Sequence, residues 1–160
     1  MGPSLALTAL TTADTGFVAR LATDERVMAY IGNGTTWSLE YTAQRVAHAL
    51  EAEEISWFIA HRQNSPVGLF TATKRTYGTE IGYWIDPDYW GQGLAKAIVG
   101  EGIEGLKVAG HTALMARVEA GNSASLKVLI SHGFIAQAQE GPGLITLTRA
   151  DPAGSMPTTF

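Results

Sequence analysis

The sequence predicts a single α/β domain, built on a mixed central sheet of about seven strands with helices on both faces. Three observations predict it. The chain has 160 residues, enough for one domain with a sizeable core. Segments with the period of an amphipathic helix alternate with short runs of β-branched and aromatic residues. A strand, a glycine-bearing loop and a helix follow one another over residues 80–108, as in a parallel part of such a sheet.

The individual elements follow from local signals. Ser38 is a good N-cap for a helix, and Gly133 stops the last one. Asn64-Ser-Pro66 predicts a hairpin turn, and residues 74–79 are expected to form a loop. Strands are expected near residues 5–10, 56–61, 67–73, 80–85, 114–119, 134–139 and 144–148; helices are expected after Thr12 or Asp14, after Asp24, over 39–53 and 94–108, and from Asn122 or Ser123 to Ser131.

The domain is expected to span residues 1–150. The tail 151–160 is rich in Pro, Gly, Ser and Thr, and we expect it to be mobile. The first residues have neither a basic region nor a long apolar run, so no signal peptide is expected. No stretch approaches the roughly 20 apolar residues of a membrane span.

Composition excludes several classes of function. A net charge of −4 gives no reason to expect nucleic acid or an anionic membrane as the main partner. The chain has no cysteine, which excludes disulfides, thiolate catalysis and cysteine zinc sites and fits a cytoplasmic location. The four histidines show no spacing typical of metal ligands, so no metal is expected.

Residues 80–95 carry the strongest functional signal. The strand 80–85 ends at Asp86-Pro87-Asp88, because proline cannot donate to a sheet ladder. Gly91 and Gly93 then bring bare backbone to the surface just before a helix. Amide N–H groups at a helix N-terminus form an anion site, so this stretch predicts a loop that holds phosphate.

Together with other motifs, this stretch resembles the GNAT superfamily of N-acetyltransferases, and more narrowly its ribosomal-protein-alanine (RimJ/RimL-like) branch. The resemblance covers residues 5–149 and implies the single-domain GNAT-like α/β fold. Each motif is weak alone, but their order and spacing together are fairly specific. The residues that carry it are Glu80–Ile85, Tyr89–Ala95, Ala116–Val118, Asn122 with Ser125, and His132–Phe134.

The resemblance assigns the loop to the pyrophosphate of acetyl-CoA. Gly93 and Ala95 fill the last two fixed positions of the family's phosphate motif, while Trp90 stands where Gln or Arg is usual. Backbone amides should therefore carry the binding. A dinucleotide Gly-x-Gly-x-x-Gly fingerprint is the rival interpretation, but Lys96 replaces its third glycine. The cofactor-binding residues expected here are Trp90, Gly91, Gln92, Gly93, Leu94 and Ala95.

Three residues of the strand before the loop have expected roles. Glu80 is implied as the general base that takes the proton of the amine, directly or through water. Its alternative role is that of a strand-end residue or ion-pair partner. Trp84 and Ile85 are expected to bind the pantetheine arm through their backbone, with one N–H polarising the thioester carbonyl; their side chains are alternatively core.

The helix after residue 121 is expected to supply the remaining groups. Asn122 is expected to contact the cofactor arm, or to act only as an N-cap. Ser125 lies on the same face of the helix and is expected to protonate the leaving thiolate, with a purely structural serine as the alternative. The family commonly has a tyrosine acid four residues later, and that position is Leu129 here. Tyr30, Trp37 and Trp57 line the acceptor pocket or, more commonly for such residues, belong to the core.

These residues predict an N-acetyltransferase that moves an acetyl group from acetyl-CoA to a primary amine by direct attack in a ternary complex. The acceptor is a protein N-terminal α-amine or a small-molecule amine. The alternative is a non-catalytic CoA-binding sensor or assembly module, which the missing tyrosine keeps open. No nucleic acid or membrane partner is expected, and a homodimer is left open.

Overall fold

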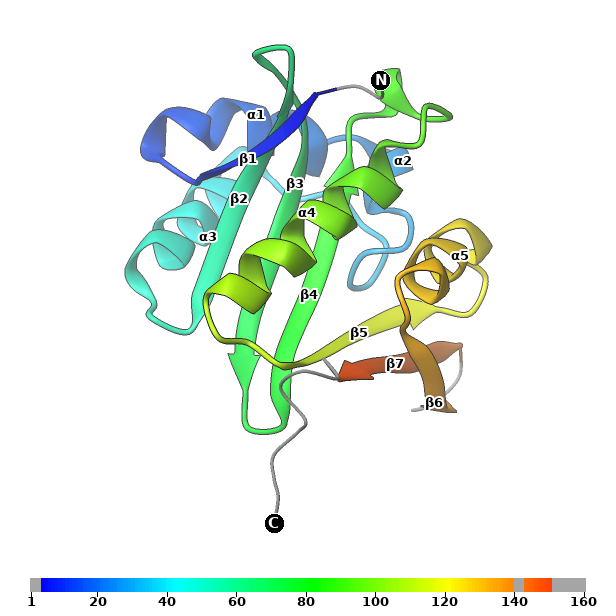
Figure 1. Ribbon diagram of the computed structural model, residues 1–160. Helices are drawn as coiled ribbons and strands as arrows, with labels where there is room; N and C mark the ends of the chain where they lie inside the picture. Colours follow the sequence, from blue (N-terminus) through cyan, green and yellow to red (C-terminus); the bar gives the residue numbers. More distant parts are fainter. Residues whose placement is uncertain (1–3, 140–142, 151–160) are drawn as a thin grey trace.

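The computed structural model describes residues 4–139 and 143–150, which form one seven-stranded sheet with helices on both faces (Figure 1). This confirms the predicted fold class. The elements in order are β1 (Leu5–Ala9), a 3-10 helix (Thr12–Asp14), α1 (Thr15–Ala22), α2 (Glu25–Met28), α3 (Leu39–Glu51), β2 (Ile55–Arg62), β3 (Ser65–Arg75), β4 (Gly78–Ile85), a second 3-10 helix (Pro87–Tyr89), α4 (Leu94–Val108), β5 (Ala113–Glu119), α5 (Ser123–Ser131), β6 (Ile135–Gln139) and β7 (Leu144–Ala150).

The strands lie in the order β1-β2-β3-β4-β5-β7-β6, and only the β4–β5 pair is parallel. This pair is short: it joins Thr79 to Leu114 and Glu80 to Met115. Beyond these residues the two strands diverge, and β5 turns away from β4 (Figure 1). Within the described ranges, the edge of β4 after Glu80 therefore has no strand partner on the β5 side.

Each face of the sheet carries its own core. Ile81 faces the core beneath α4, and Trp84 faces the other core, which α1–α3 cover. The alternation expected of a strand buried on both sides explains this division. Because both faces of β4 are packed, the course of this strand is fixed by the two layers of helices around it.

Helix α4 is long and carries three glycines, which the sequence marks as a weakness. The structure explains the glycine at position 102. Gly102 lies against the ring of Phe70, and a Cβ atom there would approach the ring closer than van der Waals contact. The glycine lets the helix lie directly on β3. Gly105 faces open space, and nothing in the structure explains it.

Some local predictions are wrong. The expected loop at 74–79 is a hairpin instead, in which Arg75 of β3 pairs with Gly78 of β4. The turn expected at 64–66 lies at Gln63 and Asn64, both with positive φ, as a two-residue hairpin turn requires. Pro66 is tolerated within β3 because it lies opposite a register shift between β2 and β3.

The last two strands, β6 and β7, pair in antiparallel orientation. Residues 140–142 and the tail 151–160, which the sequence predicts to be mobile, lie outside the described residues. No described helix combines the length and the apolar character that crossing a bilayer requires.

Candidate functional site

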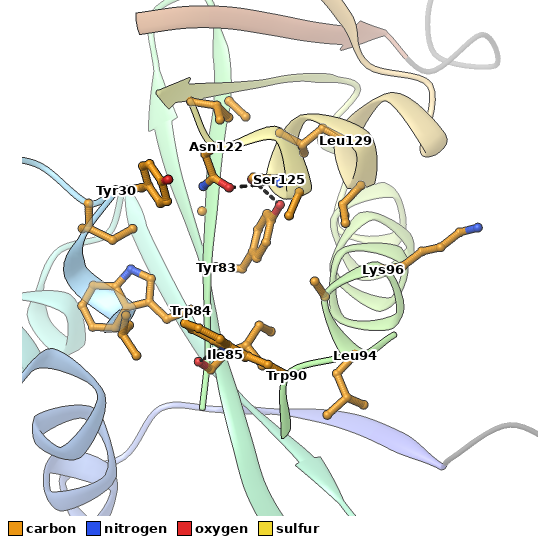
Figure 2. A pocket seen from close by; sticks show the side chains of 18 of the residues that line it. Tyr30, Tyr83, Trp84, Ile85, Trp90, Leu94, Lys96, Asn122, Ser125 and Leu129 are labelled. Carbon is orange, nitrogen blue, oxygen red and sulfur yellow. Dashed lines mark hydrogen bonds between the residues drawn. The ribbon is translucent and has the colours of Figure 1, made fainter. Parts of the chain in front are cut away.

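A cavity of about 600 Å³ opens where β4 and β5 diverge. The unpaired part of β4 forms one wall, the starts of α4 and α5 form two others, and residues in and after α2 close the far end (Figure 2). Most of its wall is apolar. The lining residues are Arg26, Val27, Tyr30, Ile31, Ile81–Ile85, Tyr89–Gly91, Gly93–Lys96, Ala116–Glu119, Asn122, Ala124, Ser125, Val128 and Leu129.

The loop before α4 presents backbone to this cavity. Gly91 and Gly93 both have positive φ, +79° and +76°, a conformation that glycine adopts without strain. Gly93 is the N-cap residue of α4, so the free amides of the first helical turn point to the loop side. Trp90 is half exposed, and its indole Nε1 donates to the carbonyl oxygen of Ile85 at 3.0 Å. The indole thus ties the loop to the end of β4.

Side chains behind the loop hold it in place. Arg62 of β2 donates from Nη1 to Oε1 of Gln92 at 2.7 Å, and its guanidinium lies 5.5 Å from the ring centre of Tyr89. Arg20 forms an ion pair with the buried carboxylate of Asp86, which also accepts from the Asp88 amide. Gln92 does not line the cavity, so its expected cofactor contact stays a prediction; the contact it makes fixes the loop.

The start of α5 brings three polar side chains together. Asn122 is the N-cap, and its Oδ1 accepts from the amide of Ser125 at 3.2 Å. The hydroxyl groups of Ser125 and Tyr83 lie 2.5 Å apart (Figure 2). Desolvation by burial raises the pKa of Tyr83 above its ordinary value, more than its hydrogen bond with Ser125 lowers it. Leu129 is fully buried in the adjoining core.

Tyr83 was missed at the level of sequence, although a signal existed. It alternates with Ile81 and Ile85 on a face of the strand that should be buried. A buried tyrosine usually needs a partner for its hydroxyl, and that requirement points to a polar group on a neighbouring helix.

Glu80 does not line the cavity. Its carboxylate receives Arg117 Nη2 at 3.1 Å and Arg117 Nε at 3.2 Å, and Arg75 Nε at 3.0 Å. Arg117 does line the cavity, so Glu80 lies behind that side chain. An ion-pair partner is the alternative role expected for Glu80, and ion pairs with Arg75 and Arg117 are the contacts the structure presents.

Among the described lining residues, Glu119 is the one with a carboxylate. It ends β5, three residues before Asn122, and was not predicted. Its signal in the sequence is its place at the C-terminal end of a strand next to the helix that carries two expected site residues.

The far end of the cavity carries aromatic and charged groups. Tyr30 lines it, whereas Trp57 is buried in the core. Trp37 makes an edge-to-face contact with Trp84, with 5.1 Å between ring centres. Arg26 lines the cavity, and its hydrogen bond to Asp24 holds the pKa of that carboxyl below its usual range.

The cavity therefore gathers all the expected site residues except Glu80 and Gln92. It offers helix-terminal amides, an unpaired strand edge and a hydroxyl pair in one apolar space. Over residues 4–139 and 143–150, no group of three or more His, Cys, Asp or Glu side chains is placed to hold a metal ion.

A family model described as an acetyltransferase (GNAT) domain matches residues 4–135. No curated protein matches the sequence. Solved structures do match in fold. One is RimL, a ribosomal L7/L12 alpha-N-protein acetyltransferase in complex with coenzyme A, with a TM-score of 0.83 and 16% identity over 94% of this chain and 96% of that one.

Two further structures extend the likeness. The spermidine N-acetyltransferase from Vibrio cholerae, in complex with CoA and spermine, has a TM-score of 0.82 and 16% identity over 92% of this chain and 95% of that one. The ribosomal-protein-alanine N-acetyltransferase from Brucella melitensis has a TM-score of 0.77 and 22% identity over 91% of this chain and 99% of that one. At these identities the likeness concerns the fold.

Proposed function

The chain belongs to the GNAT acetyltransferase family and is an acyltransferase, and we propose that it moves an acetyl group from acetyl-CoA to a primary amine by direct attack in a ternary complex. The observation that carries the proposal is the cavity itself. It joins the bare backbone at the start of α4 to an unpaired strand edge and continues to a separate far end, which supports room for donor and acceptor at once.

The donor would bind along β4. Amides from Gly91 to Ala95 are proposed to hold the pyrophosphate, because they precede or open α4 and the glycines leave them bare. The backbone of Trp84 and Ile85 is proposed to bind the pantetheine arm as an added strand would. One of these N–H groups would stabilise the oxyanion formed when the amine attacks. Asn122, on the opposite wall, is proposed as a further contact to the arm.

Two carboxylates are proposed for the proton of the amine. Glu80 is the one that the family resemblance implies, and from its place behind Arg117 it would act through water. Glu119 lines the cavity and would act directly. A substrate ammonium must lose a proton before it can attack, so one such group has a chemical purpose. The leaving thiolate is proposed to receive its proton from Ser125.

The acceptor is proposed to be a single amine, such as a protein N-terminus. An α-amine, with a pKa of about 8, loses its proton more readily than a lysine or polyamine nitrogen near 10.4, and this supports an α-amine acceptor. The basic side chains around the cavity leave little net positive charge in it: Arg26 is paired with Asp24, Arg117 is paired with Glu80, and Lys96 points away from the cavity (Figure 2).

The test is thiol release from acetyl-CoA in the presence of an amine panel of N-terminal peptides, free amino acids, a lysine peptide and spermidine. We expect release with at least one monoamine, together with its acetylated product, and little release with spermidine. Tight CoA binding without thiol release for any amine would favour the non-catalytic binding module instead.

A further inference from the structure

The position of the family's tyrosine acid is occupied by a side chain that cannot donate a proton. Leu129 is aliphatic and fully buried against the core. The thiolate that leaves acetyl-CoA must still take up a proton. Another group that borders the cavity, or water, has to supply it.

Tyr83 reaches the same place from the opposite wall. It projects from β4 on the face of Ile81 and Ile85, towards α4 and α5. Its hydroxyl lies 2.5 Å from Oγ of Ser125, a short hydrogen bond between hydroxyl groups, and both residues line the cavity (Figure 2). A tyrosine from a strand therefore stands in contact with the first turn of the helix from which the usual tyrosine would come.

Ser125 is held so that it can pass a proton on. Its amide is fixed by the N-cap side chain of Asn122. A hydroxyl group carries one donor and two acceptor sites, so Ser125 Oγ can accept from Tyr83 and keep its own proton for another acceptor. The phenol is the stronger acid of the two, which favours this direction of the bond.

From this geometry we infer that Tyr83 is the proton source for the leaving thiolate and acts through Ser125. The inference rests on the acetyl transfer proposed above. As the C–S bond breaks, the sulfur takes the proton of Ser125 Oγ, and Oγ takes the proton of the Tyr83 hydroxyl. The phenolate then regains a proton from water. Ser125 is the catalytic residue of this pair, because its hydroxyl group meets the sulfur. Tyr83 positions that hydroxyl group and reprotonates it.

The burial of Tyr83 suits this role. Desolvation raises its pKa, so the phenol keeps its proton across the neutral range and starts each turnover as a donor. After the transfer, the phenolate is formed in a place that disfavours its charge, which drives it to take a proton back before the next acetyl-CoA reacts.

The test is a double-mutant cycle of Tyr83→Phe, Ser125→Ala and the double variant, with Tyr77→Phe as a control. Tyr77 is exposed in the β3–β4 hairpin and does not line the cavity. General acids contribute about 100-fold or more, and water replaces part of that. We expect Tyr83→Phe and Ser125→Ala each to lower kcat by about tenfold to a hundredfold, with KM for acetyl-CoA nearly unchanged. The double variant should be no slower than the slower single variant.

In the kinetic test, the inference would be overturned by an unchanged kcat in Tyr83→Phe, or by losses that multiply in the double variant, which would mean independent roles. A crystal structure with CoA gives a check that does not depend on the variants folding. The CoA sulfur should lie within hydrogen-bond distance of Ser125 Oγ, and a sulfur elsewhere would refute the relay. A wild-type protein that binds CoA but transfers nothing would refute the proposed function and the relay together, whereas normal turnover in Tyr83→Phe refutes the relay alone.

Discussion

Glu80 and Glu119 are both candidates for the general base that takes the proton of the amine, and their contacts in the structure differ. Glu80 is held by two arginines behind the cavity wall, so its carboxylate oxygens are already engaged in ion pairs. Glu119 lies on the wall itself. The geometry thus favours Glu119, although the family resemblance implies Glu80.

Substituting each glutamate with glutamine tests this. We expect Glu119→Gln to lower kcat by about a hundredfold, the low end for a general base. Glu80→Gln should lower kcat less, because it removes an ion pair and leaves the wall in place. Glu104→Gln is the matched control, since Glu104 is an exposed residue of α4. A larger loss of kcat in Glu80→Gln than in Glu119→Gln would assign the base to Glu80.

The protonation of Tyr83 can be measured without any assay of activity. Burial raises its pKa, so the folded protein should keep this phenol neutral above pH 10, where an ordinary tyrosine ionises. The phenolate absorbance of the wild type minus that of Tyr83→Phe isolates this group. Ser125→Ala removes the hydrogen bond that lowers the pKa, so it should move the titration higher still. A difference titration at or below pH 10 would contradict the burial described here.

At the scale of elements, the proposed phosphate loop contains two glycines with left-handed backbone conformation, Gly91 and Gly93. Gly93→Val places a β-branched residue at φ +76°, which costs about 1–3 kcal/mol or distorts the loop. We expect CoA affinity to fall by roughly fivefold to a hundredfold in a calorimetric titration. Gly110→Val introduces the same kind of strain, at φ +95°, away from the cavity. It should lower stability and leave CoA affinity unchanged; equal affinity losses in both variants would argue against a phosphate role for the loop.

Helix α4 offers a second matched pair of glycines. Gly102→Ala pushes a methyl group into the ring of Phe70, and overpacking of this kind costs about 1–3 kcal/mol of unfolding free energy. Gly105→Ala adds a methyl group in open space within the same helix and should stabilise it by up to about 1 kcal/mol. Urea denaturation measures both. Equal effects of the two substitutions would mean that α4 does not lie against β3 as described.

The elements that could be predicted are those whose boundaries are set by a residue at the boundary itself. Ser38, Asn122 and Gly93 mark helix starts by their own chemistry, and the structure has helices beginning after each. The hairpin at 74–79 could not be predicted in the same way, because its polar residues pair only once the neighbouring strands are in place. Pro66 likewise lies in a strand only because a register shift in β2 accommodates it.

The same distinction, between local and long-range causes, holds for the candidate site. The proposed phosphate loop is contiguous in sequence, so the backbone conformation of Gly91 to Ala95 before a helix could be predicted as a unit. The contact between Tyr83 and Ser125 joins residues 42 positions apart, and neither a tyrosine nor a serine at these positions is enough to predict it. Glu80 shows the converse: the family resemblance implies a base, but the ion pair of Glu80 with Arg117, on another strand, becomes visible only in the folded chain.

At the scale of the whole molecule, the cavity lies between two parts of the sheet that are joined by the short β4–β5 pairing and by the packing of α4 against α5. A ligand that spans this opening should stabilise the whole domain. At a CoA concentration of 100 times Kd, the gain is about 2.7 kcal/mol. For a chain of this size that corresponds to a rise in Tm of roughly 5–10 °C. Thermal unfolding with and without CoA measures it, and an unchanged Tm at saturating CoA would contradict the site.

The central claim is direct transfer of the acetyl group within a ternary complex, and initial-rate kinetics test it most directly. Acetyl-CoA and the best monoamine of the panel are varied together, and CoA release is followed. Direct transfer predicts intersecting reciprocal plots and no acetylated protein after incubation with acetyl-CoA alone. Parallel plots with an isolable acetyl-enzyme, or no CoA release with any amine, would contradict it.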